Sequence, residues 1–307
     1  MTTLEHDALP GFIGESYPDR ERWIKARRLA LGGSDVPALL GLSSYSTPLR
    51  VWTSKVGAEP PDASTYSMRR GSHMEAFIAD ELAHAADGVE VERIFGHAEY
   101  VIARRVDERR LAYSPDALLR DPDLALGEWK SQLRGAKRWD VAVPLDVQPQ
   151  CQHGMYVMGL PACYVAVDLG HEMRWERIER DPLYGERVVP ALLAWWDRYV
   201  VTETPPPPTA ADGDVLAWLH PEDHGGVVTL PNDLVESAAQ LEALEDVRDN
   251  ATEAIDEIKN RVKAALGDAT RGELPDGSGW TWKLTKRKGF TVAPTEFRQL
   301  RWVKGRR

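Results

Sequence analysis

Four consecutive prolines, Pro205–Pro208, interrupt this chain of 307 residues. Proline has no backbone N–H, and its ring clashes with the preceding helical turn, so neither a helix nor a central strand can run through the stretch. We therefore predict a first domain over residues 1–204, a proline-rich linker over 205–230 and a separate region over 231–307.

The region after the linker has a helical pattern. Its apolar residues recur at steps of three and four from Leu234 to Leu266, which predicts one long amphipathic helix or two helices in a hairpin. The turn residues Pro275–Gly279 follow, and then an alternating segment that starts at Trp280. We expect a helical appendage that ends in a β-hairpin.

The first domain mixes both kinds of element. Helical spacing covers residues 19–30, 36–40, 74–86 and 148–158, whereas short strands are expected at 100–103, 111–113, 124–130 and 164–168. Helices before and after a run of strands predict an α/β domain, with a mixed central sheet flanked by helices.

Charge is unevenly distributed along the chain. The formal net charge is −10, but residues 281–307 hold nine cations and one anion, or +8, and the other 280 residues carry 29 cations and 47 anions, or −18. This asymmetry indicates local contact with an anionic partner, or a basic tail that only aids solubility. There is no membrane-spanning apolar run, no secretory signal and only two cysteines, so we expect a cytoplasmic protein that does not contact membranes.

A candidate catalytic motif lies on two of the predicted strands. Ser114-Pro115-Asp116 is followed by Glu128-Trp129-Lys130, and residues two apart on a strand point to the same face. A hairpin would bring Asp116 beside Glu128, which would make an oxygen site suited to Mg²⁺ or Mn²⁺, with Lys130 as an adjacent positive charge. An acid and a lysine at this spacing also occur on ordinary solvated faces, so the motif is weak by itself.

Other polar residues accompany the motif. Glu75 lies on the helix before the sheet and Gln150 on the helix after it, while Arg27 and Ser34 precede a short helix. An arginine and a helix N-terminus can together hold a phosphate. Each of these features also has a purely structural interpretation, such as a first-turn acid or a capped helix.

The order of these motifs resembles that of the YqaJ-type viral recombinase exonucleases. These are relatives of phage lambda exonuclease within the PD-(D/E)XK nuclease superfamily. The resemblance covers about residues 19–168 and rests on the following segments: Trp23-x3-Arg27-x6-Ser34-Asp35, Gly41-x6-Pro48-x3-Trp52, Gly71-x3-Glu75, Ser114-Pro115-Asp116, Glu128-x-Lys130 and Gln150-x-Gln152-His153-x-Met155.

The resemblance implies a role for each matched residue. Asp116, Glu128 and the carbonyl of Trp129 would bind the metal, and Glu75 would complete the metal-binding or water-orienting set. Lys130 would be the catalytic lysine, and Gln150 would contact the site from its helix. Arg27 and Ser34 would lie near a recessed 5′-phosphate. Arg134 and Lys137 are further candidates for residues that line the DNA path, although neither belongs to a matched motif.

The resemblance also implies an activity and partners. We expect an Mg²⁺-dependent 5′→3′ exonuclease, with Mn²⁺ able to substitute, that resects double-stranded DNA ends for a single-strand annealing protein. It would act as a homo-oligomer, by resemblance a ring-shaped trimer, in the cytoplasm of a bacterial host if a phage encodes it.

Two alternatives remain. One is a different PD-(D/E)XK nuclease, either an endonuclease or a repair nuclease. The other is a non-catalytic DNA-end-binding or assembly protein.

Two residues depart from the ordinary pattern. Ala117 stands where relatives usually have glycine, so we expect a turn without a positive φ there. Gly154 lies inside a predicted helix, where glycine costs about 1 kcal/mol relative to alanine. A close backbone approach would explain this glycine.

Overall fold

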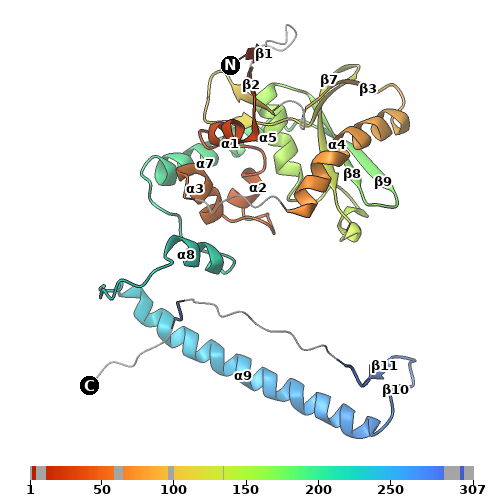
Figure 1. The fold of residues 1–307 in the computed structure, drawn as a ribbon, viewed down its shortest axis with the longest axis vertical. Helices are drawn as coiled ribbons and strands as arrows, with labels where there is room; N and C mark the ends of the chain where they lie inside the picture. Colours follow the sequence, from red (N-terminus) through yellow and green to blue (C-terminus); the bar gives the residue numbers. More distant parts are fainter. Residues whose placement is uncertain are drawn as a thin grey trace. The chain divides into compact units, whose positions relative to one another are not determined.

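The computed structural model describes residues 2–4, 12–58, 65–95, 100–133, 135–286 and 298–300. The chain divides into two compact units, Met1–Leu219 and His220–Arg307 (Figure 1). Each unit is described by itself below.

The first unit is built around a five-stranded mixed sheet. Its strand order is β3-β6-β7-β8-β9. β7 and β8 are parallel and the other neighbours antiparallel, because helix α5 (Gln148–Met158) connects β7 to β8 as a crossover. The strands are β3 (Glu90–Ile94), β6 (Ala117–Asp121), β7 (Asp123–Ser131), β8 (Ala162–Asp168) and β9 (Met173–Glu179).

Two helices cover the two faces of this sheet (Figure 1). On one face, α4 (Tyr66–Ala85) packs Ile78 and Leu82 onto alternate residues of β6, β7 and β8. On the other face, α5 packs Cys151 and Met155 onto the intervening residues of the same strands. The central strands are therefore apolar on both faces, as expected for a covered sheet.

A second, four-stranded sheet completes the unit. Its order is β1-β2-β4-β5, with strands β1 (Thr2–Leu4), β2 (Phe12–Tyr17), β4 (Tyr100–Arg105) and β5 (Ala112–Tyr113). Three helices lie between β2 and α4 in the chain: α1 (Arg20–Arg27), α2 (Val36–Leu39) and α3 (Pro48–Val56). Asp19 caps α1 and Thr47 caps α3 through their side-chain oxygens, as the residue types predict.

The first unit continues beyond the proline run, unlike the predicted boundary at residue 204. The chain passes through α6 (Tyr184–Arg187), α7 (Val189–Trp195), a π-helical turn (Trp196–Val200) and the prolines, and then forms α8 (Gly213–Leu219). Thr47 donates a hydrogen bond of 2.5 Å to the buried Asp212, and Arg50 pairs with Asp214. These contacts hold α8 against α3, so the structural division falls at Leu219.

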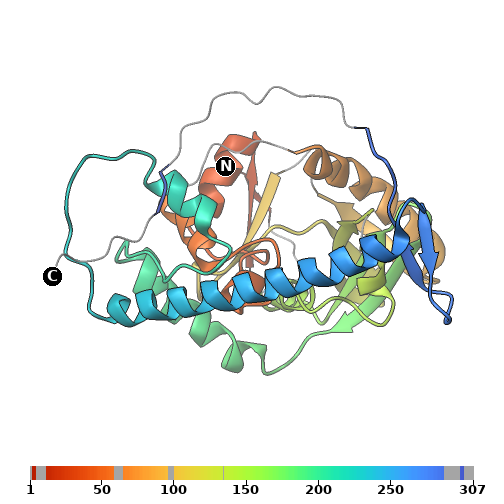
Figure 2. The same cartoon turned by 90° about the horizontal axis from the view of Figure 1, so that it is seen from below.

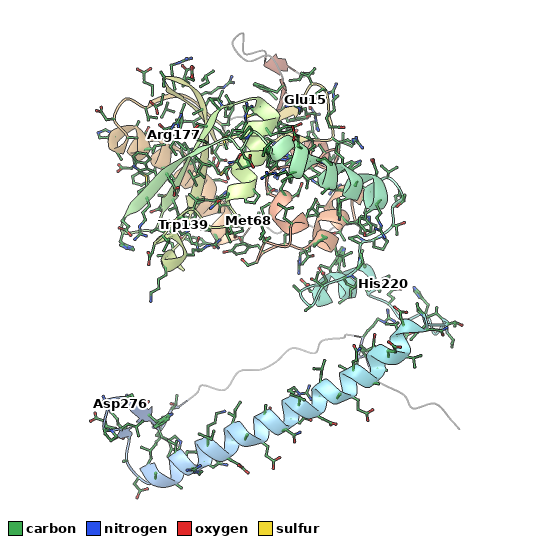
Figure 3. All side chains as sticks on the ribbon, turned by 180° about the vertical axis from the view of Figure 1, so that it is seen from behind. Glu15, Met68, Trp139, Arg177, His220 and Asp276 are labelled. Atoms are coloured by element: carbon green, nitrogen blue, oxygen red, sulfur yellow. The ribbon has the colours of Figure 1, made fainter. Side chains whose placement is uncertain are left out.

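The second unit consists of a long helix and a hairpin. α9 (Asp233–Leu266) is one uninterrupted helix of 34 residues, which excludes the helical-hairpin alternative (Figure 2). Side chains stand out all around it, and none of its residues is buried (Figure 3). β10 (Arg271–Glu273) and β11 (Gly279–Thr281) form the hairpin. The predicted fold class, a helix-flanked mixed sheet with a helical and β-hairpin appendage, is confirmed.

No helix in the described ranges is both long enough and apolar enough to cross a membrane. Most of the basic C-terminal stretch, residues 287–297 and 301–307, lies outside these ranges.

Candidate active site

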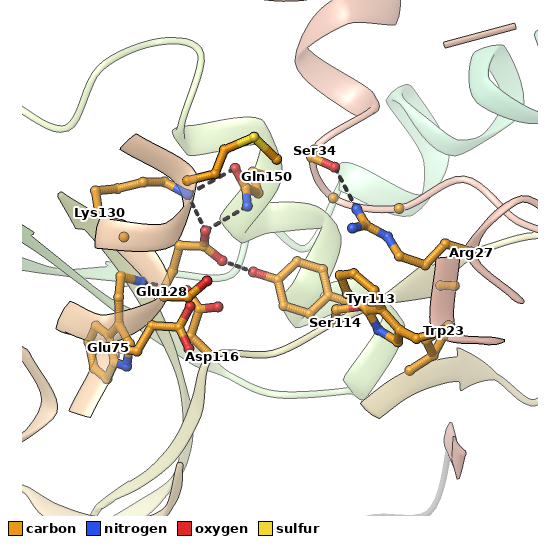
Figure 4. A pocket seen from close by; sticks show the side chains of 18 of the residues that line it. Trp23, Arg27, Ser34, Glu75, Tyr113, Ser114, Asp116, Glu128, Lys130 and Gln150 are labelled. Atoms are coloured by element: carbon orange, nitrogen blue, oxygen red, sulfur yellow. Dashed lines mark hydrogen bonds and ion pairs between the residues drawn. The ribbon is translucent and has the colours of Figure 1, made fainter. Parts of the chain in front are cut away.

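A pocket of about 470 Å³ opens between α1, α4, the β5–β6 connection, β7 and α5 (Figure 4). Its lining includes eight of the ten residues selected from the sequence: Arg27, Ser34, Glu75, Asp116, Glu128, Trp129, Lys130 and Gln150. Lys137 is exposed on a short 3₁₀ helix (Ala136–Trp139) and does not line this pocket. Arg134 lies outside the described residues.

The β6–β7 hairpin brings the acidic residues together. Ala117 pairs with Gly127, so Asp116, just before β6, lies beside the middle of β7. The Asp116 carboxylate accepts a hydrogen bond of 2.7 Å from the backbone N–H of Trp129. Glu128 and Lys130 project together toward α5, whereas the Trp129 indole packs with the α4 cluster on the opposite face. The predicted alternation on this strand is confirmed.

Glu128 is the most heavily bonded carboxylate of the pocket. Only 2% of the residue is exposed. Lys130, the Tyr113 hydroxyl and the Gln150 amide all donate hydrogen bonds to it (Figure 4). Lys130 also donates to the Gln150 carbonyl oxygen at 3.2 Å. Gln150 therefore orients both the acid and the amine, and Tyr113 is a site residue that the sequence analysis did not select.

Negative charge in the pocket exceeds what one lysine can balance. Burial raises the pKa of Asp116 well above its ordinary value, and the charge of Glu128 adds to this shift. Burial also raises the pKa of Glu75 to about 7, again with a contribution from Glu128. Burial lowers the pKa of Lys130, but the charges of Glu128 and Asp116 outweigh it, so the pKa is raised and the amine stays protonated.

These residues fit a hard divalent cation that takes few protein ligands. Asp116, Glu128 and the Trp129 carbonyl supply oxygen donors, and a cation would relieve the repulsion that raises the pKa of Asp116. Among the described residues, however, no group of three or more His, Cys, Asp or Glu side chains is arranged to hold a metal ion. Glu75 shares the pocket, but Ser72 of its own helix donates a hydrogen bond to it. The structure thus does not show Glu75 as a third metal-binding carboxylate.

Arg27 and Ser34 form a separate polar corner of the same pocket (Figure 4). Arg27 Nη2 donates to Ser34 Oγ at 3.0 Å. The guanidinium also lies over the Trp23 ring, 4.5 Å from its centre. An arginine held in this way presents a fixed cation beside a hydroxyl, a combination that suits an anionic phosphate.

His153 tethers α5 to the loop that carries Ser34. The ring is fully buried, and Nε2 lies 3.2 Å from the carbonyl oxygens of both Leu31 and Ala112. Since both neighbours are acceptors, Nε2 carries the proton, and Nδ1 accepts from the Tyr184 hydroxyl at 3.1 Å. Burial lowers the pKa of His153 to about 4.

This shift predicts a pH-dependent contribution to stability. The unfolded histidine, with an ordinary pKa of about 6.5, takes up a proton before the folded one does, so stability present above pH 6.5 is lost as the pH falls toward 4. Between pH 7 and pH 5, we expect His153 to account for about 2 kcal/mol of lost unfolding free energy. Urea unfolding at both pH values should show a smaller loss for His153→Gln than for the wild type. Equal losses would contradict this account.

The close approach expected at Gly154 is confirmed, because other side chains lie directly against its backbone. A Cβ at this position would lie 2.6 Å from both the Tyr113 ring and the Leu126 side chain. Gly33 meets the same ring from the other side, where a Cβ would lie 2.5 Å from Tyr113. Tyr113 thus reaches Glu128 between two glycines. Among the described residues, Glu203 is the only non-glycine with a positive φ, so Ala117 avoids that conformation as expected.

Gly154→Ala should destabilise the protein although alanine is the better helix former. The added methyl group would overlap Tyr113 and Leu126, and such overpacking costs about 1–3 kcal/mol. Gly71→Ala in α4 is the matched control, because nothing lies within 4 Å of its Cβ position. It should stabilise by about 0.5–1 kcal/mol. Urea midpoints that shift in the same direction for both variants would contradict the packing argument.

Residues 22–161 match the family model of the YqaJ-like viral recombinase domain. Over these residues the chain is similar to the YqaJ-like viral recombinase family. This confirms the resemblance inferred from the motifs, and the matched span contains all eight of the selected residues that line the pocket.

Further similarities extend beyond the recombinase domain. An uncharacterized protein of Bacillus subtilis (strain 168), YqaJ, is 27% identical in an alignment 274 residues long that covers 84% of this chain and 81% of that protein. Two crystal structures of the alkaline exonuclease LHK-Exo of Laribacter hongkongensis, one in complex with dAMP, align with a TM-score of 0.47 and 17% identity. The alignments cover 59% of this chain and 93% of theirs.

Proposed function

We propose that this chain is an Mg²⁺-dependent deoxyribonuclease, namely a 5′→3′ exonuclease that resects linear duplex DNA and leaves a 3′ strand for annealing. One observation carries the proposal. In a recombinase domain, a pocket with two clustered carboxylates and a protonated lysine also contains an arginine–serine pair suited to a phosphate.

Asp116, Glu128 and the Trp129 carbonyl would hold the divalent ion, with Mn²⁺ as a substitute for Mg²⁺. When bound, the ion would supply a water of lowered pKa and neutralise charge on the scissile phosphate.

The side chains of this chain have distinct roles in the proposed reaction. Lys130, protonated and fixed by Glu128 and Gln150, stabilises negative charge that develops on the phosphoryl oxygens. Tyr113 and Gln150 hold Glu128 in one orientation. Glu75, which lines the pocket and has a pKa of about 7, accepts or returns a proton near neutral pH.

The 5′ polarity of the proposed digestion comes from the family resemblance, and the corner formed by Arg27 and Ser34 supports it. A terminal 5′-phosphate bound there would leave the next phosphodiester for the carboxylates, because both groups line one pocket. The strand would then be shortened from its 5′ end.

Arg27→Ala should selectively reduce the preference for 5′-phosphorylated ends. A charge-assisted hydrogen bond contributes about 1.5–3 kcal/mol, so we expect a loss of about 10- to 100-fold in the ratio of rates on 5′-phosphate and 5′-hydroxyl duplexes. Arg22→Ala, an exposed position of the same helix, is the control. Equal loss on both kinds of end would remove Arg27 from this role.

The proposal includes partners. The substrate would be double-stranded DNA ends, the active form a homo-oligomer such as a trimeric ring, and the 3′ strand would pass to a single-strand annealing protein. In a ring, basic side chains that line the central channel would surround the DNA and separate it from the acidic outer surface. Light scattering of the purified protein measures the oligomer number.

Closed circular and linear duplex DNA, each incubated with Mg²⁺, test the proposal against its alternatives. An exonuclease consumes only the linear DNA. Cleavage of the circle would indicate an endonuclease of the same superfamily. End binding without cleavage of either substrate would indicate a non-catalytic DNA-end-binding or assembly protein.

A further inference from the structure

Asp35 ends the N-terminal motif that also contains Arg27 and Ser34, and it has no role in the proposed reaction. It follows Ser34 directly, yet it does not line the pocket. Its side chain is 14% exposed, and its Oδ2 lies 2.6 Å from Lys55 Nζ. The same oxygen accepts a hydrogen bond of 2.7 Å from the backbone N–H of Gly32.

Lys55 connects this loop to α1. Its side chain is only 4% exposed and extends from α3 to Asp35. Lys55 Nζ donates a hydrogen bond of 3.3 Å to the carbonyl oxygen of Arg27. The ion pair thus holds both ends of the segment from Arg27 to Asp35, whose side chains Arg27 and Ser34 meet at 3.0 Å.

The Asp35 carboxylate has a lowered pKa in the folded protein. Burial raises the pKa of Asp35, but the Lys55 ammonium and the Gly32 N–H outweigh burial, and the pKa is lowered. Two buried charges add little net stability compared with apolar residues of the same shape, because both are desolvated. The pair instead fixes the conformation of the loop, because Asp35 accepts a hydrogen bond from Gly32 and Lys55 donates one to the Arg27 carbonyl oxygen.

We propose that Asp35 and Lys55 are positioning residues, whose buried ion pair holds Arg27 and Ser34 in the arrangement that binds a 5′-phosphate. This inference rests on the proposed function. Asp35 also neutralises Lys55, so the cation that faces a ligand in this corner is Arg27.

A second buried ion pair provides a matched control. Glu15 on β2 and Arg104 on β4 have side chains that are each 5% exposed, with 3.0 Å between Oε2 and Nε. Neither residue lines the pocket. Glu15→Gln (Glu15 is labelled in Figure 3) removes a buried charge from the same unit while Arg104 keeps its hydrogen bond to the Ala26 carbonyl.

The test compares wild type, Asp35→Asn, Asp35→Asn/Lys55→Met and Glu15→Gln. Fluorescence anisotropy measures metal-free binding of duplexes that end in a 5′-phosphate or a 5′-hydroxyl, and digestion with Mg²⁺ gives kcat and KM. The double variant leaves no unpaired buried charge, so it keeps the test valid if Asp35→Asn does not fold.

In both Asp35 variants, we expect the preference for 5′-phosphate over 5′-hydroxyl ends to fall at least about tenfold, both in Kd and in KM. The kcat and the binding of 5′-hydroxyl ends should change less than about twofold. Glu15→Gln should keep the preference. The inference is overturned if the double variant keeps the preference, if Glu15→Gln loses it equally, or if the wild type has none. A wild type that prefers 5′-phosphate ends but cleaves nothing would contradict the proposed function alone.

Discussion

Asp116→Asn is expected to abolish Mg²⁺-dependent degradation of linear duplex DNA, with a rate loss of about 10³-fold or more. Asparagine keeps the shape of the side chain and an oxygen for the Trp129 N–H, but it removes the charge that a divalent ion needs. A loss of about 4 kcal/mol of metal-dependent stabilisation of the transition state corresponds to this factor. The release of acid-soluble nucleotides measures the rate.

The control for this variant is Asp123→Asn. Asp123 is an exposed aspartate at the start of the same strand β7 and does not line the pocket. It should degrade DNA at the wild-type rate, and both variants should bind duplex ends as the wild type does. Asp116→Asn that digests DNA at the wild-type rate would show that the metal site is assigned wrongly.

Lys130→Ala should slow cleavage by about 10²- to 10⁴-fold at saturating Mg²⁺. The variant removes the only cation that contacts Glu128 among the described residues, and with it the stabilisation of charge that develops on the phosphate. Because the ammonium acts on the reacting phosphate in this account, the loss should appear in kcat. Raising the Mg²⁺ concentration from limiting to saturating should not restore the rate.

Lys25→Ala is the matched control, because Lys25 is exposed on α1 and its ion pair among the described residues is with the exposed Glu21. A Lys130→Ala enzyme that regains wild-type kcat with added Mg²⁺ would contradict a direct role. The lysine would then serve only to balance the charge of Glu128.

Much of the site could be predicted from the sequence because it depends on local periodicity. The two-residue repeat of a strand places Glu128 and Lys130 on one face, and the short β6–β7 hairpin places Asp116 beside them. The order of the motifs also indicated the family. Helical spacing predicted α9 but could not distinguish one helix from a hairpin, because both have the same apolar repeat.

Contacts between distant segments could not be predicted. Tyr113 reaches Glu128 only because glycines on two other segments leave room for its ring. The proline run suggested a domain end, but Thr47 binds Asp212 across 165 positions of sequence and extends the unit to Leu219. No pattern near either partner signals such a pairing.

We propose that the pocket at Asp116, Glu128 and Lys130 hydrolyses DNA ends with a divalent metal. The most direct test is incubation of a linear duplex labelled at one 5′ or one 3′ end, with Mg²⁺ or with EDTA. The account predicts early release of the 5′ label in small products, retention of the 3′ label on a long strand, and no release in EDTA. Equal release with and without Mg²⁺, or no release in either, would contradict it.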